Sequence, residues 1–279
     1  MDSRSGEKTP RPLVVVTGAA GRVGRLTSQA LSGRYRLRLV DREWPAEELR
    51  EAEDGPERLA LDLSHSSAWD KAIESAHAVV HLAGNAHPEI DAKTAFEGGA
   101  MLTAHLAAAA AGSDLKRIVF ASSIHTMGLH HRHGHYPISR QWAPRPCCEY
   151  GAAKVFSENL LEILTERTPI SVVCLRLGLV GFPPATADLA SQWLGPRDFA
   201  QLLQAALTVP VHYGAYLGMS AGAADRWDLT ETIRDLGFNS SDTAPDPEPL
   251  PDAGEGRPAT HCLMFNPATL PPPTDRTED

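Results

Sequence analysis

Cysteine, aromatic side chains, long apolar runs and excess positive charge are all scarce in this chain of 279 residues. With 26 Lys and Arg against 35 Asp and Glu, the net charge is −9, which argues against a nucleic-acid partner because phosphate binding needs a basic surface. Nowhere do about 18 apolar residues occur in succession, and the polar N-terminal stretch contains no apolar signal segment. We therefore expect neither a membrane span nor secretion.

The four cysteines, of which Cys147 and Cys148 are adjacent, match no disulfide framework and no paired C-x-x-C metal spacing. A reducing compartment, the cytoplasm, is the expected location. Because 42% of the residues are hydrophobic, a chain of this length can form one large domain, or one domain with a small lobe.

Short β-branched runs alternate with helical patterns over the first two thirds of the chain. The expected strands are 13–17, 36–41, 59–62, 78–82, 117–120 and 171–175, and the expected helices are 22–32, 66–75 under a serine cap, 92–111 and 150–166. Strands that alternate with helices predict an α/β fold with a doubly wound parallel sheet of the Rossmann type.

The pattern loosens after Leu177, where a helix over 197–207, a strand over 211–217 and a helix over 226–236 are expected. This part is too short for a second domain and predicts a small C-terminal substrate lobe from about residue 178. The domain would span 12–238, between a polar extension over 1–11 and a Pro-rich acidic tail over 239–279. Such a tail cannot order itself fully, although its apolar stretch at 262–265 could dock on the domain or on a partner subunit.

A glycine-rich turn, Thr17 to Gly24, lies between the first expected strand and the first helix, where backbone N–H groups can bind a pyrophosphate. Asp41 ends the second strand, 17 residues beyond Gly24, as in a dinucleotide site. A carboxylate there accepts hydrogen bonds from ribose hydroxyls and repels a 2′-phosphate, so we expect NAD rather than NADP, although the neighbouring Arg42 weakens this preference. A tight turn and a solvated Asp41 are the alternatives without function.

Tyr150 and Lys154 share one face of an expected helix, and Ser122 and Ser123 end an expected strand. The lysine can lower the tyrosine pKa electrostatically, which would bring a phenol into the range of a useful base. A surface pair on the helix is the alternative, but the glycine-rich turn and the serines favour catalysis.

Seven motifs together resemble the extended short-chain dehydrogenase/reductase superfamily, also called NAD-dependent epimerases/dehydratases. They are TGAAGRVG at 17–24, the Asp41 strand end, LDL at 61–63, HLAG at 81–84, FASS at 120–123, YGAAK at 150–154 and RLG at 176–178. The resemblance covers about residues 12–238. The phrases FASSIHTMG, RLGLVGFPP and WLGPRDFAQLLQAAL look most like the uronate dehydrogenase group, which oxidises the anomeric carbon of a hexuronic acid to a lactone.

The resemblance implies a role for each matching residue. Tyr150 would exchange the substrate hydroxyl proton, Lys154 would bind the nicotinamide ribose, and Ser123 would hydrogen-bond the reacting oxygen. The implied cofactor-binding residues are Gly18, Gly21, Arg22, Val23, Gly24, Asp41, Arg42, Asp62, Leu63, Leu82, Ala83, Gly84, Tyr150, Lys154 and Leu177.

The chain departs from the uronate dehydrogenase pattern at its substrate contacts. Ile124 stands where that group has an asparagine, while His125 remains, and Asp188 stands where it has an arginine that binds the substrate carboxylate. Because a carboxylate at Asp188 would repel a uronate, these changes argue against a hexuronate substrate. The substrate-binding candidates are Ser123, Ile124, His125, Asp188 and Trp193.

Two clusters of potential metal or redox residues lie before Tyr150. The stretch His130 to His135 lacks a strict ligand spacing, so we expect a surface loop at the pocket rim and no metal site. We expect Cys147 and Cys148 to be small residues of the pocket wall rather than a redox pair.

These observations predict an NAD(H)-dependent oxidoreductase that transfers hydride between nicotinamide and a small molecule. The reacting group would be a secondary alcohol or ketone, or the cyclic hemiacetal of a sugar-like or natural-product intermediate. An NAD-dependent epimerase of a sugar and a cofactor-sensing regulatory protein on the same fold remain as alternatives. A homo-oligomer is possible.

Overall fold

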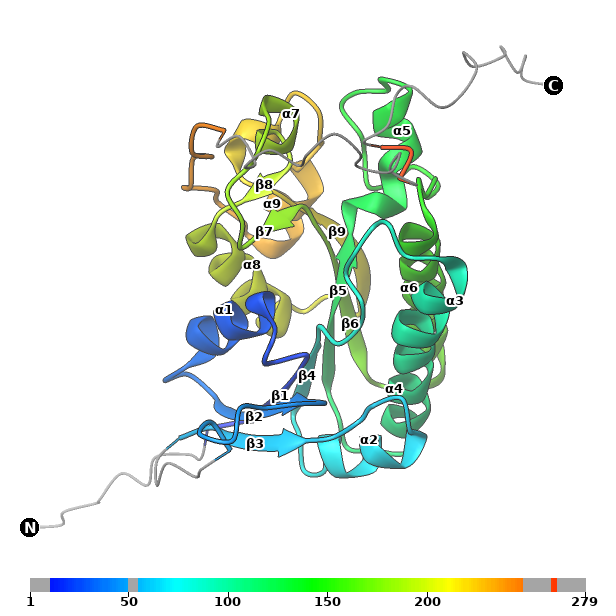
Figure 1. The fold of residues 1–279 in the computed structure, drawn as a ribbon, viewed down its shortest axis with the longest axis vertical. Helices are drawn as coiled ribbons and strands as arrows, with labels where there is room; N and C mark the ends of the chain where they lie inside the picture. Colours follow the sequence, from blue (N-terminus) through cyan, green and yellow to red (C-terminus); the bar gives the residue numbers. More distant parts are fainter. Residues whose placement is uncertain (1–10, 50–54, 248–261, 265–279) are drawn as a thin grey trace, which may run out of the picture.

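The computed structural model describes residues 11–49, 55–247 and 262–264. A seven-stranded sheet forms its centre, with the order β3-β2-β1-β4-β5-β6-β9 and every neighbouring pair parallel (Figure 1). The strands are β1 (Leu13–Thr17), β2 (Arg36–Asp41), β3 (Glu57–Ala60), β4 (Ala78–His81), β5 (Arg117–Ser123), β6 (Ser171–Leu177) and β9 (Tyr213–Gly218). This arrangement confirms the predicted doubly wound α/β fold. The strand order reverses between β1 and β4, where such sheets bind ligands at the carboxyl ends of their strands.

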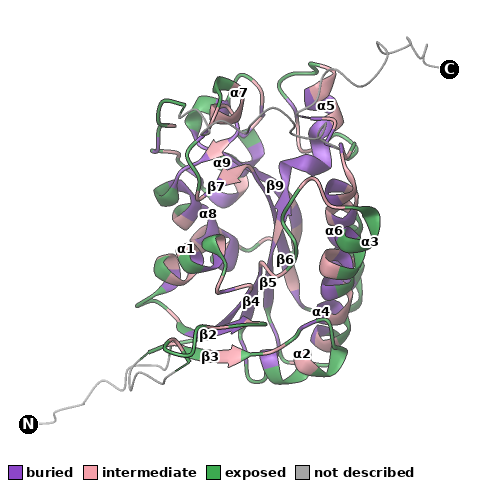
Figure 2. Ribbon diagram, in the orientation of Figure 1, coloured by how far each residue is buried: buried purple, intermediate pink, exposed green. Residues whose placement is uncertain are grey.

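Helices cover both faces of the sheet. On one face lie α1 (Arg22–Leu31) and α8 (Pro196–Thr208), and on the other lie α2 (Ser66–Ile73), α4 (Met101–Ala111) and α6 (Glu149–Arg167) (Figure 1). Two hydrophobic clusters fill the space between the layers, because successive strand residues such as Val14 and Val15 point to opposite faces. The central strands are accordingly buried along their length (Figure 2).

Several element boundaries differ from the sequence prediction. β3 lies two residues earlier than expected because its register pairs Asp41 with Ala60 on a half-exposed edge strand, where no buried apolar run marks the ends. β5 and β6 continue to Ser123 and Leu177, so that the serines belong to the strand itself. The expected serine cap of α2 is wrong, because His65 precedes the helix and makes no side-chain capping bond.

The expected helix over 92–111 contains a π-helical turn. α3 (Ala92–Ala95) and α4 flank the turn Phe96–Ala100. Its adjacent glycines, Gly98 and Gly99, let the backbone adopt the wider π-helical conformation. The irregularity matters for the site because the carbonyl oxygen of Gly98 accepts the N–H of Asn85 at 3.1 Å.

The smaller elements gather above the carboxyl ends of the strands. They are the 3₁₀ turns Ile124–Met127 and Ala221–Ala223, the helices α5 (Gly128–Arg132), α7 (Ala187–Ala190) and α9 (Thr230–Leu236), and the pair β7 (Leu179–Val180) and β8 (Trp193–Leu194) (Figure 1). β9 is the seventh strand of the main sheet rather than part of a separate lobe. α9 starts at Thr230, later than expected, where the Asp228 carboxylate accepts the Thr230 N–H.

Two described parts of the C-terminal segment pack on the domain. Ser240 and Ser241 hydrogen-bond the buried Asp198 of α8, and Cys262 and Met264 are buried in the core cluster that contains Met127. The rest of the predicted tail, and the extension before residue 11, lie outside the described residues. In the described part of the chain, no helix combines the length and the apolar character that crossing a bilayer requires.

Candidate active site

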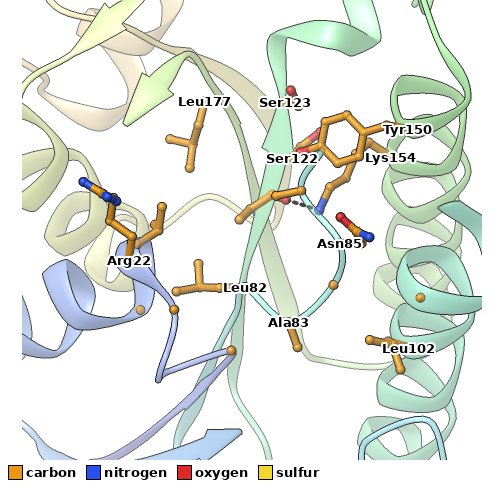
Figure 3. Close-up of a pocket in the computed structure, with 18 of the residues that line it drawn as sticks. Arg22, Leu82, Ala83, Asn85, Leu102, Ser122, Ser123, Tyr150, Lys154 and Leu177 are labelled. Carbon is orange, nitrogen blue, oxygen red and sulfur yellow. Dashed lines mark hydrogen bonds between the residues drawn. The ribbon is translucent and has the colours of Figure 1, made fainter. Parts of the chain in front are cut away.

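A cavity of about 970 Å³ opens at the carboxyl ends of the strands, where the strand order reverses. Its lining comes from the segments that follow the first six strands of the main sheet, β1 to β6, together with the α3–α4 region and the start of α6 (Figure 3). A volume of this size lies at the upper end of the range of about 300–1,000 Å³ that ligand pockets occupy. The fold thus gathers residues distant in sequence around one large ligand.

The glycine-rich turn packs so closely against other backbone segments that Gly18 and Gly24 leave no room for a side chain. Gly18 has φ +67°, and a Cβ there would lie 2.9 Å from the backbone nitrogen of Ala83. A Cβ on Gly24 would lie 2.3 Å from the carbonyl oxygen of Gly18. The turn therefore presents bare backbone to the cavity at the start of α1, as the pyrophosphate of a dinucleotide requires. The residues present fit a bound NAD.

Asp41 lies at the end of β2, next to this turn. Its Oδ2 accepts the N–H of Ala20 at 2.9 Å, and its Oδ1 accepts the N–H of Arg42 at 2.7 Å. The Arg42 side chain is exposed and pairs with Glu43 at 3.5 Å. A carboxylate fixed in this position can accept ribose hydroxyls and disfavours a 2′-phosphate.

Ser123, Tyr150 and Lys154 lie together on the opposite wall of the cavity (Figure 3). Ser123 ends β5, whereas Tyr150 and Lys154 are one turn apart at the start of α6. Lys154 Nζ donates to the carbonyl oxygen of Ala121 at 2.7 Å and lies 5.6 Å from the centre of the Tyr150 ring. The three side chains thus have the arrangement that proton exchange with a substrate hydroxyl needs.

The electrostatics of this group differ from the prediction. Burial raises the pKa of Tyr150 to about 12, although the hydrogen bond with Ser123 opposes the rise. Burial also lowers the pKa of Lys154 to about 8, against the attraction of Glu158. The expected lowering of the Tyr150 pKa by Lys154 is not found in the protein alone, because loss of hydration outweighs the other effects on the phenol.

All the residues expected to bind the cofactor contribute to the described lining, from the glycine-rich turn to Leu177. Ser123, Ile124 and His125 also contribute, whereas Asp188 and Trp193 do not belong to the lining as far as it is described. The structure thus brings together most of the predicted site but places two substrate candidates outside it.

Asp188 is occupied by neighbouring side chains. Its carboxylate forms an ion pair with Arg226 and accepts Nε2 of Gln192 at 3.1 Å. The indole N–H of Trp193 donates to the carbonyl oxygen of Phe182 at 3.0 Å. The Asp188 carboxylate is thus already paired with Arg226, and contact of Asp188 or Trp193 with the substrate stays a prediction.

Several polar lining residues were missed by the sequence reasoning, among them Asn85 and Gln192. Asn85 follows the HLAG motif directly and lines the cavity on the same side as Tyr150 and Lys154 (Figure 3). Gln192 is buried, lines the cavity and contacts His131 Nε2 at 3.3 Å. The position of Asn85 after HLAG was a usable signal, while nothing in the sequence marks Gln192.

The histidine-rich stretch is not a surface loop throughout. His130 and His131 are buried on α5, where His131 stacks on Trp227 with 5.9 Å between ring centres and His130 Nε2 lies 3.0 Å from the carbonyl oxygen of Ala143. Cys147 and Cys148 are not part of the described cavity lining either, so their expected place in its wall is wrong. Their sulfur atoms instead face Nδ1 of His125.

Comparison with known proteins agrees with this geometry. The model of the NAD dependent epimerase/dehydratase family matches residues 14–184. The NAD-dependent glucose-6-phosphate dehydrogenase of Haloferax volcanii is 28% identical over 258 residues, which is 86% of this chain and 98% of that protein. The L-arabinose 1-dehydrogenase (NAD(P)(+)) of the same organism is 29% identical over 261 residues, covering 83% and 97%.

Among solved structures, the chain is similar to uronate dehydrogenase from Agrobacterium tumefaciens in a complex with NAD. The TM-score is 0.75 at 27% identity, and the match covers 88% of this chain and 92% of the other. The fold, the cavity and the family match agree, and this protein is a member of the NAD-dependent epimerase/dehydratase family, an enzyme of the short-chain dehydrogenase/reductase type with NAD as its cofactor.

Proposed function

We propose that this enzyme oxidises the cyclic hemiacetal of a sugar-like molecule without a carboxylate and passes the hydride to NAD. The arrangement of Ser123, Tyr150 and Lys154 on one wall of the cavity carries this proposal. The names of the related proteins, which include a glucose-6-phosphate dehydrogenase and an L-arabinose 1-dehydrogenase, support a sugar as the substrate.

Each of the three side chains has a distinct task in such a reaction. Ser123 donates a hydrogen bond to the oxygen that becomes a carbonyl, and the Tyr150 oxygen takes the hydroxyl proton. Lys154 orients the ribose, and its positive charge would stabilise the Tyr150 phenolate against the burial that raises the pKa of this phenol in the protein alone. Bound NAD supplies the hydride acceptor.

The charges in the cavity support an uncharged ring. Two arginines and one lysine contribute to its described lining, and each has a partner in the protein. Arg22 donates to the Gly181 carbonyl at 2.8 Å and lies 4.0 Å over the Phe182 ring. Arg42 forms an ion pair with Glu43, and Lys154 donates to the Ala121 carbonyl. Around the reacting end, the side chains of Asn85, Ser123 and Gln192 offer neutral hydrogen-bonding groups. Arg22 and Arg42 belong to the segments expected to bind the cofactor, so Lys154 is the one Lys or Arg of the described lining on the wall with Ser123 and Tyr150, and it is engaged with Ala121.

NADH formation with a panel of sugars tests the proposal. Neutral aldoses such as L-arabinose, D-galactose and D-glucose are expected to be oxidised with higher kcat/KM than glucuronate or galacturonate. Equal or better turnover of a uronate would overturn the assignment of an uncharged substrate. Interconversion of two sugars with no net NADH would instead identify an epimerase.

A pair of tyrosine variants distinguishes a loss of catalysis from a general effect on the fold. Tyr150→Phe is expected to lower kcat by about 10²-fold or more, because a positioned acid–base group contributes about 10²–10⁴-fold. Tyr136→Phe is the matched control, because the Tyr136 hydroxyl donates to the His131 carbonyl outside the described cavity lining. Equal loss in both variants would contradict the role of Tyr150.

A further inference from the structure

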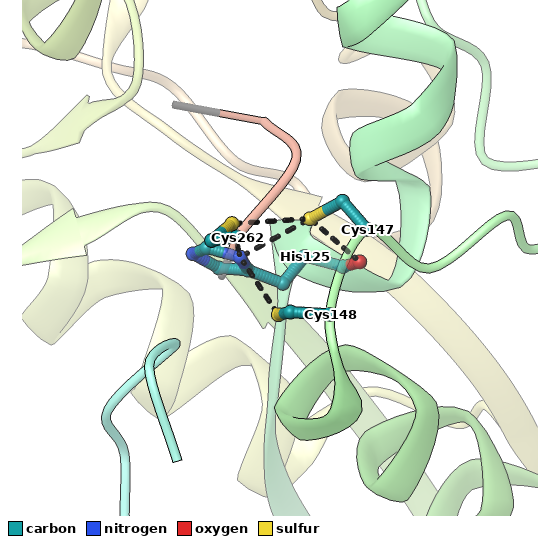
Figure 4. A group of neighbouring side chains, drawn as sticks. All are labelled: His125, Cys147, Cys148 and Cys262. Carbon is teal, nitrogen blue, oxygen red and sulfur yellow. Dashed lines mark hydrogen bonds between the residues drawn. The ribbon is translucent and has the colours of Figure 1, made fainter. Parts of the chain in front are cut away.

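Four potential metal ligands converge next to the active site. Nδ1 of His125 and the sulfur atoms of Cys147, Cys148 and Cys262 all lie within 4.8 Å of one another (Figure 4). Cys147 and Cys262 are fully or almost fully buried, and Cys148 is half-buried. These residues come from three segments of the chain: the turn after β5, the residues before α6, and the described C-terminal segment Cys262–Met264.

Four of the six distances among these atoms match a tetrahedral zinc site, and the two between Cys148 and the other sulfur atoms are within 4.8 Å. His125 Nδ1 lies 3.3 Å from the sulfur of Cys147, 3.5 Å from that of Cys148 and 3.4 Å from that of Cys262. The sulfur atoms of Cys147 and Cys262 are 3.6 Å apart. Zn–S bonds of about 2.3 Å and Zn–N bonds of about 2.0–2.1 Å in a tetrahedron give S···N edges of about 3.5 Å and S···S edges of about 3.8 Å.

Neither hydrogen bonding nor a disulfide accounts for this arrangement. One imidazole nitrogen carries either one proton or one lone pair, so Nδ1 of His125 can form a single good hydrogen bond, yet three sulfur atoms approach it equally. A disulfide needs an S–S distance of about 2.05 Å, and it would use only two of the three thiols. A metal ion satisfies all four atoms at once.

We propose that His125, Cys147, Cys148 and Cys262 bind one Zn²⁺ ion as a closed Cys₃His site. Thiolate and imidazole ligands select this class of cation, and four protein ligands leave no open position for water. The three cysteines are outside the described cavity lining, so the ion would act on the structure rather than on the substrate. On binding, the thiols release their protons to solvent, and the site has a net charge of −1 with a neutral imidazole.

The surrounding backbone already holds the ligands in place. The N–H of Leu263 donates to the carbonyl oxygen of Cys147 at 3.0 Å, and Arg132 donates to the carbonyl oxygen of Leu263 at 2.9 Å. A Cβ on Gly128 would lie 2.2 Å from the sulfur of Cys147, so only glycine lets this thiol reach the cluster. A pre-organised site of this kind needs little rearrangement to accept a metal.

The position of the cluster indicates what the ion would do. His125 is two residues after Ser123, and Cys148 is two residues before Tyr150, so one ion would connect the two elements that carry these catalytic side chains. It would also fasten Cys262–Met264 to both of them. Ligation through Nδ1 would leave the His125 proton on Nε2, which fixes the tautomer of a ring that lines the cavity.

This proposal contradicts the sequence prediction of no metal site. The sequence prediction missed the cluster because its ligands do not have the usual spacing along the chain. Cys147 and Cys148 are adjacent, and the other two ligands are far from them along the chain. A search for two pairs of ligands, such as C-x-x-C, does not find such a set. Only the docking of Cys262 assembles it.

Metal analysis of the purified full chain under reducing conditions tests the proposal. We expect about one zinc per chain, either as purified or after addition of Zn²⁺, and an X-ray absorption spectrum with three sulfur neighbours at about 2.3 Å and one nitrogen at about 2.0–2.1 Å. Failure to bind Zn²⁺ in either preparation, or a shell dominated by oxygen, would overturn it. A Cys147–Cys262 disulfide in a reduced, zinc-supplied sample would also do so.

A pair of cysteine variants tests the ligand assignment. Cys262→Ser should lower zinc affinity by more than about 100-fold, because losing even an outer-shell partner of a metal ligand costs about 10–100-fold. Cys174→Ser is the matched control, because Cys174 is also fully buried but lies in β6, outside the cluster. Full zinc affinity in folded Cys262→Ser, or equal loss in both variants, would contradict the proposal. If Cys262→Ser does not fold, the absorption spectrum of the unaltered chain decides.

Removal of the ion should separate binding from catalysis. A chelated chain is expected to retain NAD affinity, because the glycine-rich turn follows β1 and Asp41 ends β2, whereas the cluster lies near the end of β5 and the start of α6. We expect kcat to fall and the Cys262 thiol to become open to alkylation. Slow alkylation of Cys262 that a chelator does not change would speak against a bound metal.

Discussion

Arg176 of β6 and Glu158 of α6 form a two-pronged ion pair in the core, with Nε to Oε1 at 3.0 Å and Nη2 to Oε2 at 2.7 Å. Their side chains are only 5% and 4% exposed. Ser122, which precedes Ser123 on β5, donates to Oε1 of Glu158 at 2.5 Å. Through this bond, the ion pair connects β6 with β5 and α6, which carry the proposed catalytic residues Ser123, Tyr150 and Lys154.

Breaking this pair should destabilise the fold strongly. Arg176→Met would leave the Glu158 carboxylate buried without its partner, and we expect a loss of about 3–5 kcal/mol in the free energy of unfolding. The double variant Glu158→Leu/Arg176→Met removes both charges and should recover most of that loss. Urea denaturation measures both. A single variant within about 1 kcal/mol of the unaltered chain would show that the pair does not hold the fold.

The sequence predicted those features that depend on a local pattern within one strand, turn or helix. The β-branched run at Leu13–Thr17 is a strand because its burial on both faces is visible in its composition. The glycine-rich turn and the spacing of Tyr150 and Lys154 are likewise local patterns, and they predicted both ends of the cavity.

The features that escaped prediction depend on contacts between distant segments. The ion pair between Asp188 and Arg226 is one of them, because no local pattern in the sequence predicts that pairing. The docking of Cys262 beside Cys147 and the hydrogen bonds of Asp242 to α8 arise in the same way. Tertiary contacts decide such positions, so propensity and spacing cannot supply them.

Asp41 should determine the choice of cofactor. Asp41→Asn keeps an acceptor for the Ala20 N–H but removes the charge that disfavours a 2′-phosphate. Because a hydrogen bond to a charged group contributes about 1.5–3 kcal/mol, we expect the NAD/NADP ratio of kcat/KM to fall by about tenfold to a hundredfold. Steady-state kinetics with both cofactors measures the ratio. An unchanged preference in Asp41→Asn would show that the charge does not select NAD.

His81 should make the fold sensitive to acid. Its ring is buried between Thr17 Oγ1 at 2.8 Å and Thr103 Oγ1 at 3.3 Å, and burial lowers its pKa from 6.5 to about 3. Between these values the unfolded chain binds a proton that the folded chain does not. The stability from a neutral His81 is therefore fully present above about pH 6.5 and is lost as the pH falls towards about 3.

Replacement of this histidine should flatten the pH dependence. His81→Gln cannot titrate, so we expect the slope of unfolding free energy against pH below 6.5 to decrease by up to about 1.4 kcal/mol per pH unit. His77→Gln, at an exposed position, is the control and should leave the slope unchanged. Denaturation at a series of pH values measures both, and equal slopes in all three proteins would count against the assignment to His81.

Asp242 should act as the missing cap of α8. Gly195, the residue before this helix, has no side chain, and the Asp242 carboxylate instead accepts the N–H groups of Arg197 at 2.8 Å and Asp198 at 3.1 Å. Asp242→Ala should cost about 0.5–2 kcal/mol, the usual loss for a helix cap, and Asp246→Ala, at an exposed position nearby, should cost almost nothing.

A Cβ at Gly195 would lie 2.3 Å from Asp242 Oδ2, so Gly195→Ala should displace the Asp242 carboxylate from the start of α8. Thermal unfolding of Asp242→Ala, Gly195→Ala and the double variant measures the losses of stability. The loss in the double variant should be smaller than the sum of the two single losses, because each single variant already removes the same capping interaction. Additive losses would mean that Asp242 does not cap the helix.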